Sequence, residues 1–584
     1  MPDSSSRAAL SPFDRRFFDG TEPLTRMGGG GIGGKAGGLA FIRDVLAARL
    51  DAGAFPAFNV SVPRLSVIGT DTFDEFMTEN DLWSVVRSER PDERIARAFQ
   101  QAAFPAERLG DLRALVEQVH SPLAVRSSSL LEDALLHPFA GVYATKMTPN
   151  NQPDADTRFR KLVEAVKYVY ASTFFDAARS YIRAMDRTPD EEKMAVIIQE
   201  VVGRRHGDRF YPDVAGVGRS YNFYRSGSAR PEDGVIDLAL GLGKTIVDGG
   251  LCWTYSPRFP RATPPFGSVG EQLKQTQVDF WAVNMGRPPA YDPTAEREYL
   301  IRCGLADADY DGTLAMVAST YLAESDRLAI GVGPAGPRVV NFAPLLVLEE
   351  YPLNDLLHRL LDICQDACGG AVEIEFALAL DRGAEPPVRF GFLQVRPMVV
   401  SREAVEVDLA CAHDPGVLAA SDRVMGNGVI GNIRDIVYVK PGTFEARFTP
   451  EIADELAVIN RALTEQRAPY LLIGFGRWGS SDPWLGIPVS WGHIGGARAI
   501  VEATLPSMDV ELSQGSHFFH NISSFGVSYF SVPHSSDFRI DWTGLDAQDL
   551  VTETRFVRHV RTRTALEVRV DGRQGAGIVL WERR

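Results

Sequence analysis

Residues 371–400 read AVEIEFALALDRGAEPPVRFGFLQVRPMVV, and the spacing of their polar and apolar residues is the most informative pattern in the sequence. Its first ten residues alternate in a way that places Glu373 and Glu375 on one face of a strand and apolar side chains on the other. The same alternation near its end places Gln394 and Arg396 on one face of a second strand. The residues between the two runs are typical of a turn. The pattern therefore predicts an antiparallel hairpin that brings these four polar side chains together.

These four side chains have the chemistry of a site for magnesium and a polyphosphate. Carboxylate and amide oxygens are ligands that Mg²⁺ prefers, and a guanidinium offsets the charge of a transferring phosphoryl group. The alternative is a half-buried hairpin whose polar face is simply solvated. The hairpin pattern alone leaves both interpretations open.

A glycine-rich stretch near the N-terminus is the second candidate. Residues 28–50 read GGGGIGGKAGGLAFIRDVLAARL and predict a loop followed by a helix, because apolar residues recur at helical spacing after the glycines. Loop amides, a helix N-terminus and Lys35 can hold a phosphate. Gly29, Gly34 and Lys35 match the spacing of a P-loop, but Ala36 replaces its Ser or Thr, and the preceding EPLTRM does not resemble a buried strand. A flexible hinge with a solvated lysine is the alternative.

The third candidate is LAVRSSSLLEDALLHPFAGVYAT, residues 123–145. Arg126 follows a predicted strand and precedes three serines, so a guanidinium and several hydroxyl groups gather near a chain reversal. Taken alone, Arg126 is equally compatible with a structural ion pair.

The chain is predicted to be α/β (α+β) and to contain several units. With 584 residues it is too long for one hydrophobic core. Short runs rich in Val and Ile predict strands separated by helices, such as one over 158–185; the strands are 123–129, 194–202, 235–243, 371–380 and 389–400. We expect a lead-in segment (1–25), N-terminal subdomains (26–235), a further subdomain (236–400) and a C-terminal α/β domain of uncertain fold (420–584). The last domain is predicted to end in a hairpin around Asp571 and Gly572.

The composition excludes several functional classes. Hydrophobic residues make up 45% and charged residues 23%, as in a folded globular protein. The net charge of −15 argues against a general nucleic-acid-binding surface. No apolar run reaches the roughly 20 residues of a membrane span, and the five widely spaced cysteines indicate reduced thiols. We therefore expect a cytoplasmic protein without nucleic-acid or membrane partners. Whether it forms a homo-oligomer is left open by the sequence.

Taken in order, the motifs between residues 33 and 397 resemble the ATP-grasp module shared by phosphoenolpyruvate synthase, pyruvate phosphate dikinase and related dikinases. GGKAGGL (33–39) is similar to GGKGxNL, VRSSSLLED with FAG (125–141) is similar to VRSSAxxED...FAG, and GLGKTIVDGG (241–250) looks like GLGExVVxG. VEIEFA and LQVRP look like DIEF and LQxRP, and MAVIIQEVVG (194–203) looks like the strand that reads the adenine. The resemblance implies that ATP and Mg²⁺ bind. It implies phosphate contacts from Lys35, Arg126 and Arg396, adenine contacts from Gln199, Glu200 and Val202, and metal contacts from Glu373, Glu375 and Gln394.

The sequence also departs from the family pattern. Lys244 replaces a glutamate, Glu373 replaces an aspartate, and GVGRSYNF (216–223) is a poor match to GVxFTxxP. The TGGxxSHxAI phosphohistidine motif and the barrel of complete dikinases are not found. We therefore predict an ATP-dependent phosphotransferase with Arg126 and Arg396 as catalytic residues and an unidentified small-molecule or protein acceptor. It is not expected to be a complete phosphoenolpyruvate synthase. The alternative is a non-catalytic ATP-binding regulatory module.

The region beyond residue 420 carries its own candidates in glycine-rich loops. One loop can cradle a second anion or the acceptor through Arg477, Ser480, Ser481 and Asp482. His517 is the best alternative phosphate carrier, because a histidine in a Gly-Ser loop can be an accessible nucleophile. The other interpretation is that His517 and His520 are packed strand residues.

Overall fold

The chain folds into two compact units of mixed α/β structure, which confirms the predicted fold class. The structure is a computed structural model and describes residues 10–88, 91–130, 132, 141–184, 188–223, 229–262, 269–274, 276–381, 383–398, 400, 405–480, 482–506, 508 and 526–582. The first unit comprises Met1–Ser220, Gly234–Ile246 and Leu251–Pro397; the second comprises Tyr221–Asp233, Val247–Gly250 and Met398–Arg584. Among the described segments, no helix combines the length and the apolar character that a membrane crossing requires.

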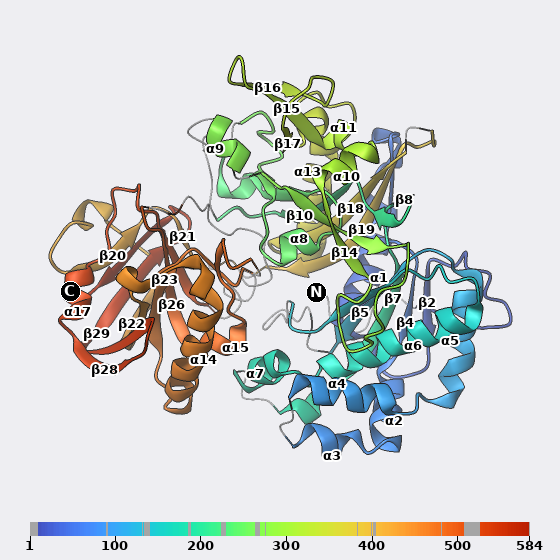
Figure 1. The fold of residues 1–584 in the computed structure, drawn as a ribbon, viewed down its shortest axis with the longest axis horizontal. Helices are drawn as coiled ribbons and strands as arrows, with labels where there is room; N and C mark the ends of the chain where they lie inside the picture. Colours follow the sequence, from blue (N-terminus) through green and yellow to red (C-terminus); the bar gives the residue numbers. More distant parts are fainter. Residues whose placement is uncertain are drawn as a thin grey trace. The chain divides into compact units, whose positions relative to one another are not determined.

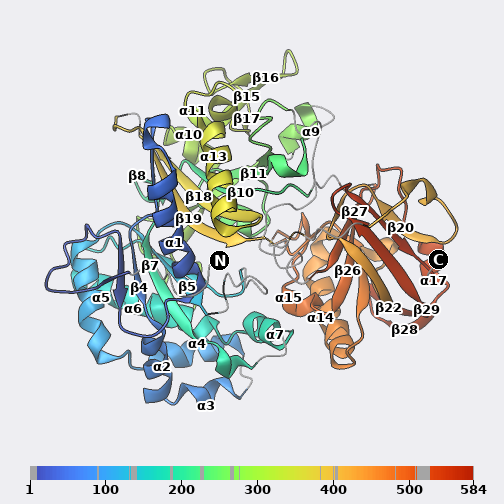
Figure 2. The same ribbon diagram turned by 180° about the vertical axis from the view of Figure 1, so that it is seen from behind.

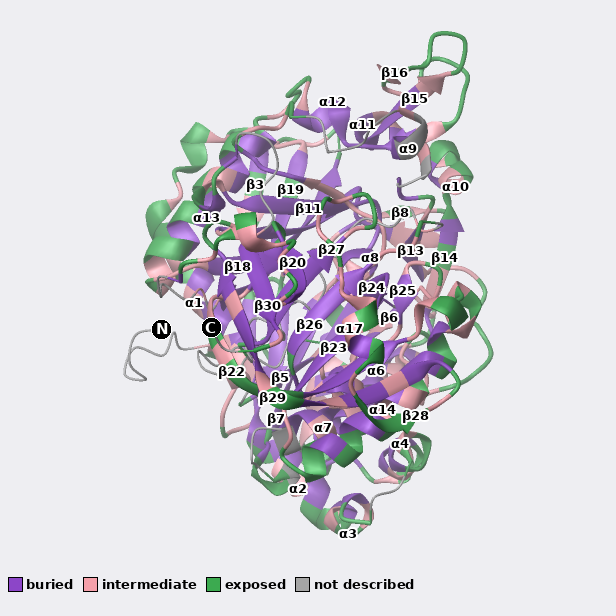
Figure 3. Cartoon of the chain, turned by 90° about the vertical axis from the view of Figure 1, so that its left-hand side faces the viewer, coloured by how far each residue is buried: buried purple, intermediate pink, exposed green. Residues whose placement is uncertain are grey.

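The first unit contains a six-stranded N-terminal sheet. Its strand order is β1 (Ser11–Pro12), β2 (Leu24–Met27), β4 (Leu65–Ile68), β7 (Met194–Glu200), β5 (Leu123–Ser129) and β6 (Thr145–Thr148). β1, β2 and β4 are parallel, and the remaining neighbours are antiparallel. Helices cover the sheet, namely α2 (Thr70–Glu79), α3 (Leu82–Val86), α4 (Asp92–Gln101), α5 (Ala106–Gln118), α6 (Ala155–Ser172) and α7 (Asp176–Ala184) (Figure 1). The strands are largely buried, whereas the outer helices expose one side (Figure 3).

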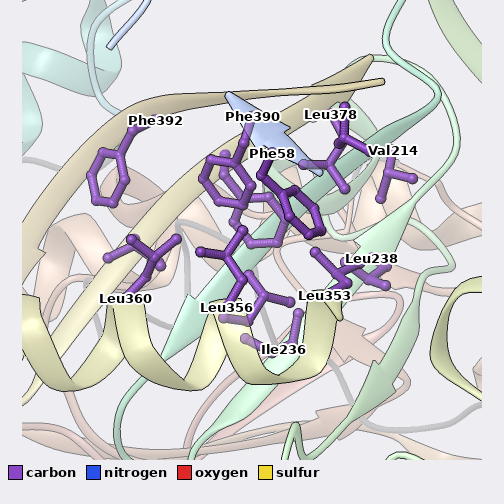
Figure 4. Packing of buried hydrophobic residues seen from close by; sticks show 14 of the residues in the cluster. Phe58, Val214, Ile236, Leu238, Leu353, Leu356, Leu360, Leu378, Phe390 and Phe392 are labelled. Atoms are coloured by element: carbon purple, nitrogen blue, oxygen red, sulfur yellow. The ribbon is translucent and has the colours of Figure 1, made fainter. Parts of the chain in front are cut away.

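The central sheet of the first unit has the order β12 (Trp253–Tyr255), β11 (Val235–Ala239), β10 (Val214–Arg219), β18 (Val372–Leu380), β19 (Val388–Pro397) and β3 (Phe58–Ser61). One face of it is apolar and packs against α13 (Leu353–Cys368). Figure 4 shows Leu356 and Leu360 of this helix facing Phe390, Phe392 and Ile236 of the sheet. Each fully buried side chain of this kind contributes about 1.5–3 kcal/mol. Because side chains alternate along a strand, the other face carries the intervening residues, which include the polar ones.

Helix α1 (Gly33–Arg49) connects the two sheets of the first unit. It packs against β5 and β7 of the N-terminal sheet and against β19 of the central sheet. Figure 2 shows it running alongside strands of both sheets. Its first turn therefore lies where the two sheets approach each other.

Two smaller sheets and short helices complete the first unit. The sheets have the orders β14 (Leu300–Gly304), β13 (Asp279–Asn284), β9 (Arg209–Tyr211), β8 (Arg204–His206), and β16 (Arg327–Ile330), β15 (Ala318–Leu322), β17 (Arg338–Val340). The helices are α8 (Lys244–Val247), α9 (Val269–Lys274), α10 (Leu305–Tyr310), α11 (Leu314–Val317) and α12 (Ala343–Leu346).

The segment between β13 and β14, residues 285–299, reaches across to the N-terminal sheet. Lys146 on β6 forms a buried ion pair with Glu298 of this segment, with Nζ and Oε2 2.8 Å apart. The same Nζ donates to the carbonyls of Pro293 and Ala295 at 2.9 and 2.8 Å. These bonds satisfy a charge that burial would otherwise make costly. They fasten the two halves of the first unit together.

The second unit is built on one large sheet. Its order is β20 (Val417–Ser421), β30 (Ala576–Leu580), β29 (Val557–Asp571), β22 (Gly428–Val439), β23 (Tyr470–Phe475), β26 (Ala497–Ala503), β27 (Ser528–Val532) and β21 (Val424–Met425), with β28 (Asp549–Glu553) beside β29. β22, β23, β26 and β27 are parallel. β20 and β21 are consecutive, and the amide of Ser531 donates to the carbonyl of Arg423 at 2.9 Å, so the sheet curls back on itself. Its helices include α14 (Thr449–Glu465), α15 (Trp491–Ile494) and α17 (Trp542–Asp546).

Several sequence predictions can be compared with these elements. The hairpin over 371–400 is confirmed, because β18 and β19 pair antiparallel. The C-terminal hairpin is also confirmed, with Asp571 opposite Ala576. The helix over 158–185 is replaced by two, α6 and α7. The prediction that EPLTRM is no buried strand is wrong, because β2 lies within the N-terminal sheet and its Thr25 hydroxyl is satisfied by Ser66 at 2.7 Å.

Candidate functional site

The polar face of the central sheet carries the four residues of the predicted hairpin. Glu373 lies opposite Arg396, and Glu375 lies opposite Gln394. Arg396 donates from Nε to Glu373 Oε1 at 2.7 Å and from Nη2 to Glu375 Oε1 at 3.2 Å. The alternation predicted from the sequence therefore places all four side chains on one face, as expected.

Arg126 brings the N-terminal sheet into contact with this face. It lies on β5, and its Nη2 donates to Gln394 Oε1 at 3.0 Å and to Glu375 Oε2 at 3.3 Å. Its Nη1 donates to the carbonyl of Leu393 at 2.8 Å and to Gln199 Oε1 at 3.2 Å. Residues far apart in the chain thus meet through one guanidinium, whose planar fork suits such multiple contacts.

The row of charges continues on the far side of Glu373. Arg219 on β10 donates from Nε to Glu373 Oε2 at 2.8 Å and from Nη1 to Asp237 Oδ2 at 3.1 Å. The hydroxyl of Thr254 on β12 donates to the other oxygen of Asp237. We call the connected set the polar strip; it consists of Arg126, Glu375, Gln394, Arg396, Glu373, Arg219 and Asp237.

The glycine-rich loop is tightly packed at the start of α1. Gly33 has φ +76°, and a Cβ there would lie 1.8 Å from the carbonyl oxygen of Ser128. A residue with a side chain cannot meet both conditions without moving the backbone. The Ser128 hydroxyl accepts from the Ala36 amide at 3.0 Å and donates to the carbonyl of Ile32. The loop is therefore a fitted connection between β2 and α1, not the flexible hinge of the alternative interpretation.

Lys35 lies in the first turn of α1 and is nearly buried. Its Nζ is 3.1 Å from Glu132 Oε1 and 3.5 Å from Ser127 Oγ. Glu132 also accepts from the Ser127 hydroxyl and from the amide of Ser129, both at 2.9 Å. The ammonium is thus directed to a buried carboxylate, and the alternative of a solvated lysine is wrong.

A second buried carboxylate, Glu192, lies near Glu132. It accepts from the Tyr143 hydroxyl at 2.8 Å and from the Lys193 amide at 3.0 Å. Burial, together with the charge of Glu132, raises the pKa of Glu192 to about 7. The pKa of this carboxyl group, close to Glu132, therefore lies near neutral pH.

The residues predicted to read an adenine are divided by the alternation along β7. Gln199 faces Arg126 and joins the polar strip through it. Glu200 turns away and pairs with Arg64, with Oε1 2.6 Å from Nε, and it accepts from the Ser121 hydroxyl. Val202 follows the strand and lies against Gly391 of β19. The side chain of Glu200 therefore points away from Arg126, and only the Glu200 backbone lies between Gln199 and Val202.

Within the polar strip, Glu375 and Gln394 have the donor chemistry that suits a divalent cation. The Glu375 side chain is 14% exposed, and its arginine contacts are long, at 3.2 and 3.3 Å. Glu373 is 3% exposed, and shorter arginine bonds occupy both of its oxygens. In the described part of the chain, no group of three or more His, Cys, Asp and Glu is arranged to hold a metal ion. Glu373 is thus held by arginines, whereas Glu375 and Gln394 fit a cation that brings further ligands.

The described candidates of the second unit bond to other groups of the chain. Arg477 is buried and donates to the carbonyl of Gly249 at 3.2 Å. Ser480 accepts from the amide of Asp482 at 3.2 Å, and Asp482 caps the amide of Trp484 at 3.0 Å, as in a tight turn. The remaining candidates, Ser481, His517 and His520, lie outside the described residues.

The residues of these networks that were not singled out from the sequence include Glu132, Arg219 and Asp237. A signal was present for each of them. Glu132 belongs to the VRSSSLLED motif, Arg219 stands in the poorly matching GVGRSYNF, and Asp237 interrupts an apolar strand. A charged residue inside a buried strand indicates a partner on a neighbouring strand, although it does not identify that partner.

The family comparison covers the part of the chain that contains the polar strip. Residues 30–413 match the family described as "Pyruvate phosphate dikinase, AMP/ATP-binding domain", which is an ATP-grasp-type nucleotide-binding domain. The match spans the polar strip, the glycine-rich loop and Lys35. No curated protein matches the chain. Because the match covers most of the 584 residues, the chain belongs to the pyruvate phosphate dikinase AMP/ATP-binding domain family.

Proposed function

We propose that the first unit binds MgATP along the polar strip and that the chain is an ATP-dependent phosphotransferase with an unidentified acceptor. The observation that carries the proposal is the contact of Arg126 with Glu375 and Gln394. It brings a guanidinium of the N-terminal sheet to a carboxylate and an amide of the central sheet. Such a combination of cationic and hard oxygen groups suits a nucleotide polyphosphate with its cation.

In this proposal Arg126 and Arg396 contact the phosphates. Both now bond to Glu375 at long distances, so a phosphate can replace that carboxylate without leaving a guanidinium unpaired. Glu375 and Gln394 would hold Mg²⁺, which neutralises phosphate charge when bound. The protein groups position the reactants and offset charge, which is most of what phosphoryl transfer requires.

The contacts to the adenine base and one further phosphate contact are assigned to β7 with the residues that follow it and to Lys35. Gln199 and Val202, with the backbone of Glu200, lie at the end of β7 and are proposed to border the adenine. Lys35 is proposed to contact a phosphate, in which case its ammonium must turn from Glu132 or be shared with it.

The second candidate function is a non-catalytic ATP-binding regulatory module. The observation that favours it is the buried ion pair of Lys35 with Glu132, since a paired lysine offers less positive charge to a phosphate. The replacement of a glutamate by Lys244 in GLGKTIVDGG points the same way. This function requires binding and closure without turnover.

Nucleotide turnover separates the two functions. The purified chain is incubated with MgATP labelled on the γ-phosphate, in water and with panels of small-molecule and protein acceptors, and AMP, ADP and phosphate are quantified. We expect release of AMP or ADP that Glu375→Gln lowers by at least about 100-fold, which is the scale for removing a group that stabilises developing charge. The matched control is Asp311→Asn, another buried carboxylate that pairs with an arginine, Arg209. Binding of MgATP without any turnover would favour the regulatory module, and absence of binding would exclude both functions.

A further inference from the structure

Arg219 occupies an unusual position between two buried carboxylates. Its Nε is 2.8 Å from Glu373, and its Nη1 is 3.1 Å from Asp237. Asp237 is fully buried, and Glu373 is nearly so. Two carboxylates removed from water in this way require a compensating positive charge. Arg219 bonds to both carboxylates, and Arg396 bonds to the other oxygen of Glu373.

Two departures from the family motifs lie at this arrangement. Arg219 stands in GVGRSYNF at the place of the aromatic residue in GVxFTxxP, and Glu373 stands at the place of an aspartate. The register of β10 and β18 places Arg219 directly opposite Glu373. The two departures from the family pattern therefore meet in space and form one feature.

The surroundings of Arg219 have the donor set of a cation site. Glu373 on β18, Asp237 on β11 and the hydroxyl of Thr254 on β12 present hard oxygen atoms, and β10 with Arg219 lies between β18 and β11. Burial lowers the pKa of Arg219, but the charges of Asp237 and Glu373 outweigh burial and hold that pKa above its ordinary value. Its Nη2 is buried without a hydrogen-bond partner among the described residues, so charge rather than complete hydrogen bonding holds the guanidinium.

We propose that Arg219 is a positioning residue that takes the place of a divalent cation between Glu373 and Asp237. It fixes the carboxylate that orients Arg396, whose Nε bonds to the other oxygen of Glu373. It also leaves Glu375 and Gln394 as the pair that serves the cation of the nucleotide. The role of Glu375 and Gln394 rests on the proposed function. The replacement of a cation by the Arg219 guanidinium does not rest on it.

The test uses the full-length chain and manganese, in the absence of nucleotide. Arg219→Met removes the charge but retains much of the side chain's volume. Titration with Mn²⁺, followed by electron paramagnetic resonance of the free ion, is expected to show about one additional bound ion per chain relative to the wild type. The matched double variant Arg219→Met with Glu373→Gln is expected to lose that ion. Equal Mn²⁺ binding by the wild type and Arg219→Met would overturn the proposal.

Stability gives a second readout if Arg219→Met folds poorly. Because a cation can replace the missing charge, millimolar Mn²⁺ is expected to raise the melting temperature of Arg219→Met more than that of the wild type. The double variant is expected to show no such difference. An unstable Arg219→Met that Mn²⁺ does not rescue would refute the exchange.

The positioning of Arg396 is tested with MgATP and Arg219→Lys. A lysine retains the charge, but it lacks the forked guanidinium that bonds to both Glu373 and Asp237. Turnover is therefore expected to fall about tenfold or more, with KM changed less than kcat. An unchanged kcat would reject the positioning role. If the wild type itself binds no MgATP, the proposed function fails, while the manganese result still decides whether Arg219 replaces a cation.

Discussion

Replacing Arg126 by methionine should weaken MgATP binding by about 30–150-fold. On binding, the guanidinium is proposed to exchange its bonds to Glu375 and Gln394, at 3.3 and 3.0 Å, for two bonds to phosphate. Charge-assisted hydrogen bonds contribute about 1.5–3 kcal/mol each, and the bonds given up are long or involve a neutral amide. The net loss is therefore about 2–3 kcal/mol, and about 1.4 kcal/mol corresponds to tenfold in affinity.

The assay is isothermal titration of MgATP into each variant, with Arg209→Met as the matched control. Arg209 likewise holds a carboxylate, Asp311, at 2.7 Å, and it bonds to a second one, Asp307, at 3.1 Å. The exposed fraction of its side chain is similarly small, 20% against 12% for Arg126. It lies in a different sheet, so its loss should cost stability but change the dissociation constant by less than about twofold. The reasoning is refuted if Arg126→Met binds MgATP as tightly as the control does.

Three further outcomes are expected. Gly33→Ala should disrupt the start of α1, because the new Cβ would clash with the backbone of Ser128 at a residue with positive φ. Gly37→Ala in the same helix places its Cβ in open space and should stabilise the protein by about 0.5–1 kcal/mol. Urea unfolding monitored by circular dichroism compares the two variants. Glu192 has a pKa raised to about 7 in the folded chain against 4.5 ordinarily, so its stabilising contribution is complete below pH 4.5 and is lost as the pH rises through 7. As the pH rises over that range, the free energy of unfolding of Glu192→Gln should therefore increase relative to that of the wild type by up to about 3 kcal/mol. Parallel pH profiles of unfolding for the two proteins would contradict the raised pKa of Glu192. Lys146→Met leaves Glu298 buried without its main partner and should destabilise the first unit by about 3–5 kcal/mol in calorimetry, and a loss below 1 kcal/mol would show that the 285–299 segment does not fasten it.

Local patterns predicted the part of the site that one hairpin supplies. The alternation in residues 371–400 is a property of neighbouring residues, so it correctly placed Glu373, Glu375, Gln394 and Arg396 on one face. The burial of β2 was missed because Thr25 reads as polar. Its hydroxyl is satisfied by Ser66, 41 residues away, which no local pattern reveals.

The partners of the charged side chains could not be predicted, since they depend on which strands become neighbours. Arg219 lies 154 residues from Glu373 and meets it only because β10 pairs with β18. Lys35 pairs with Glu132, 97 residues further on, and the glycine-rich sequence around Lys35 does not identify that partner. Sequence identifies which residues need partners, and strand order decides which partners they obtain.

The charge balance of the polar strip bears on how a nucleotide can enter. Its three arginines are matched by three carboxylates, namely Glu375, Glu373 and Asp237. A polyphosphate alone would take Arg126 and Arg396 from Glu375 and leave that carboxylate beside new negative charge. A divalent cation on Glu375 removes this conflict, because the carboxylate then gains a partner as the arginines move to phosphate. In the proposed function, cation and nucleotide must therefore strengthen each other's binding by the same factor. Glu373, held by Arg219, does not take part in the exchange, and this keeps Arg396 in place while its other bond changes.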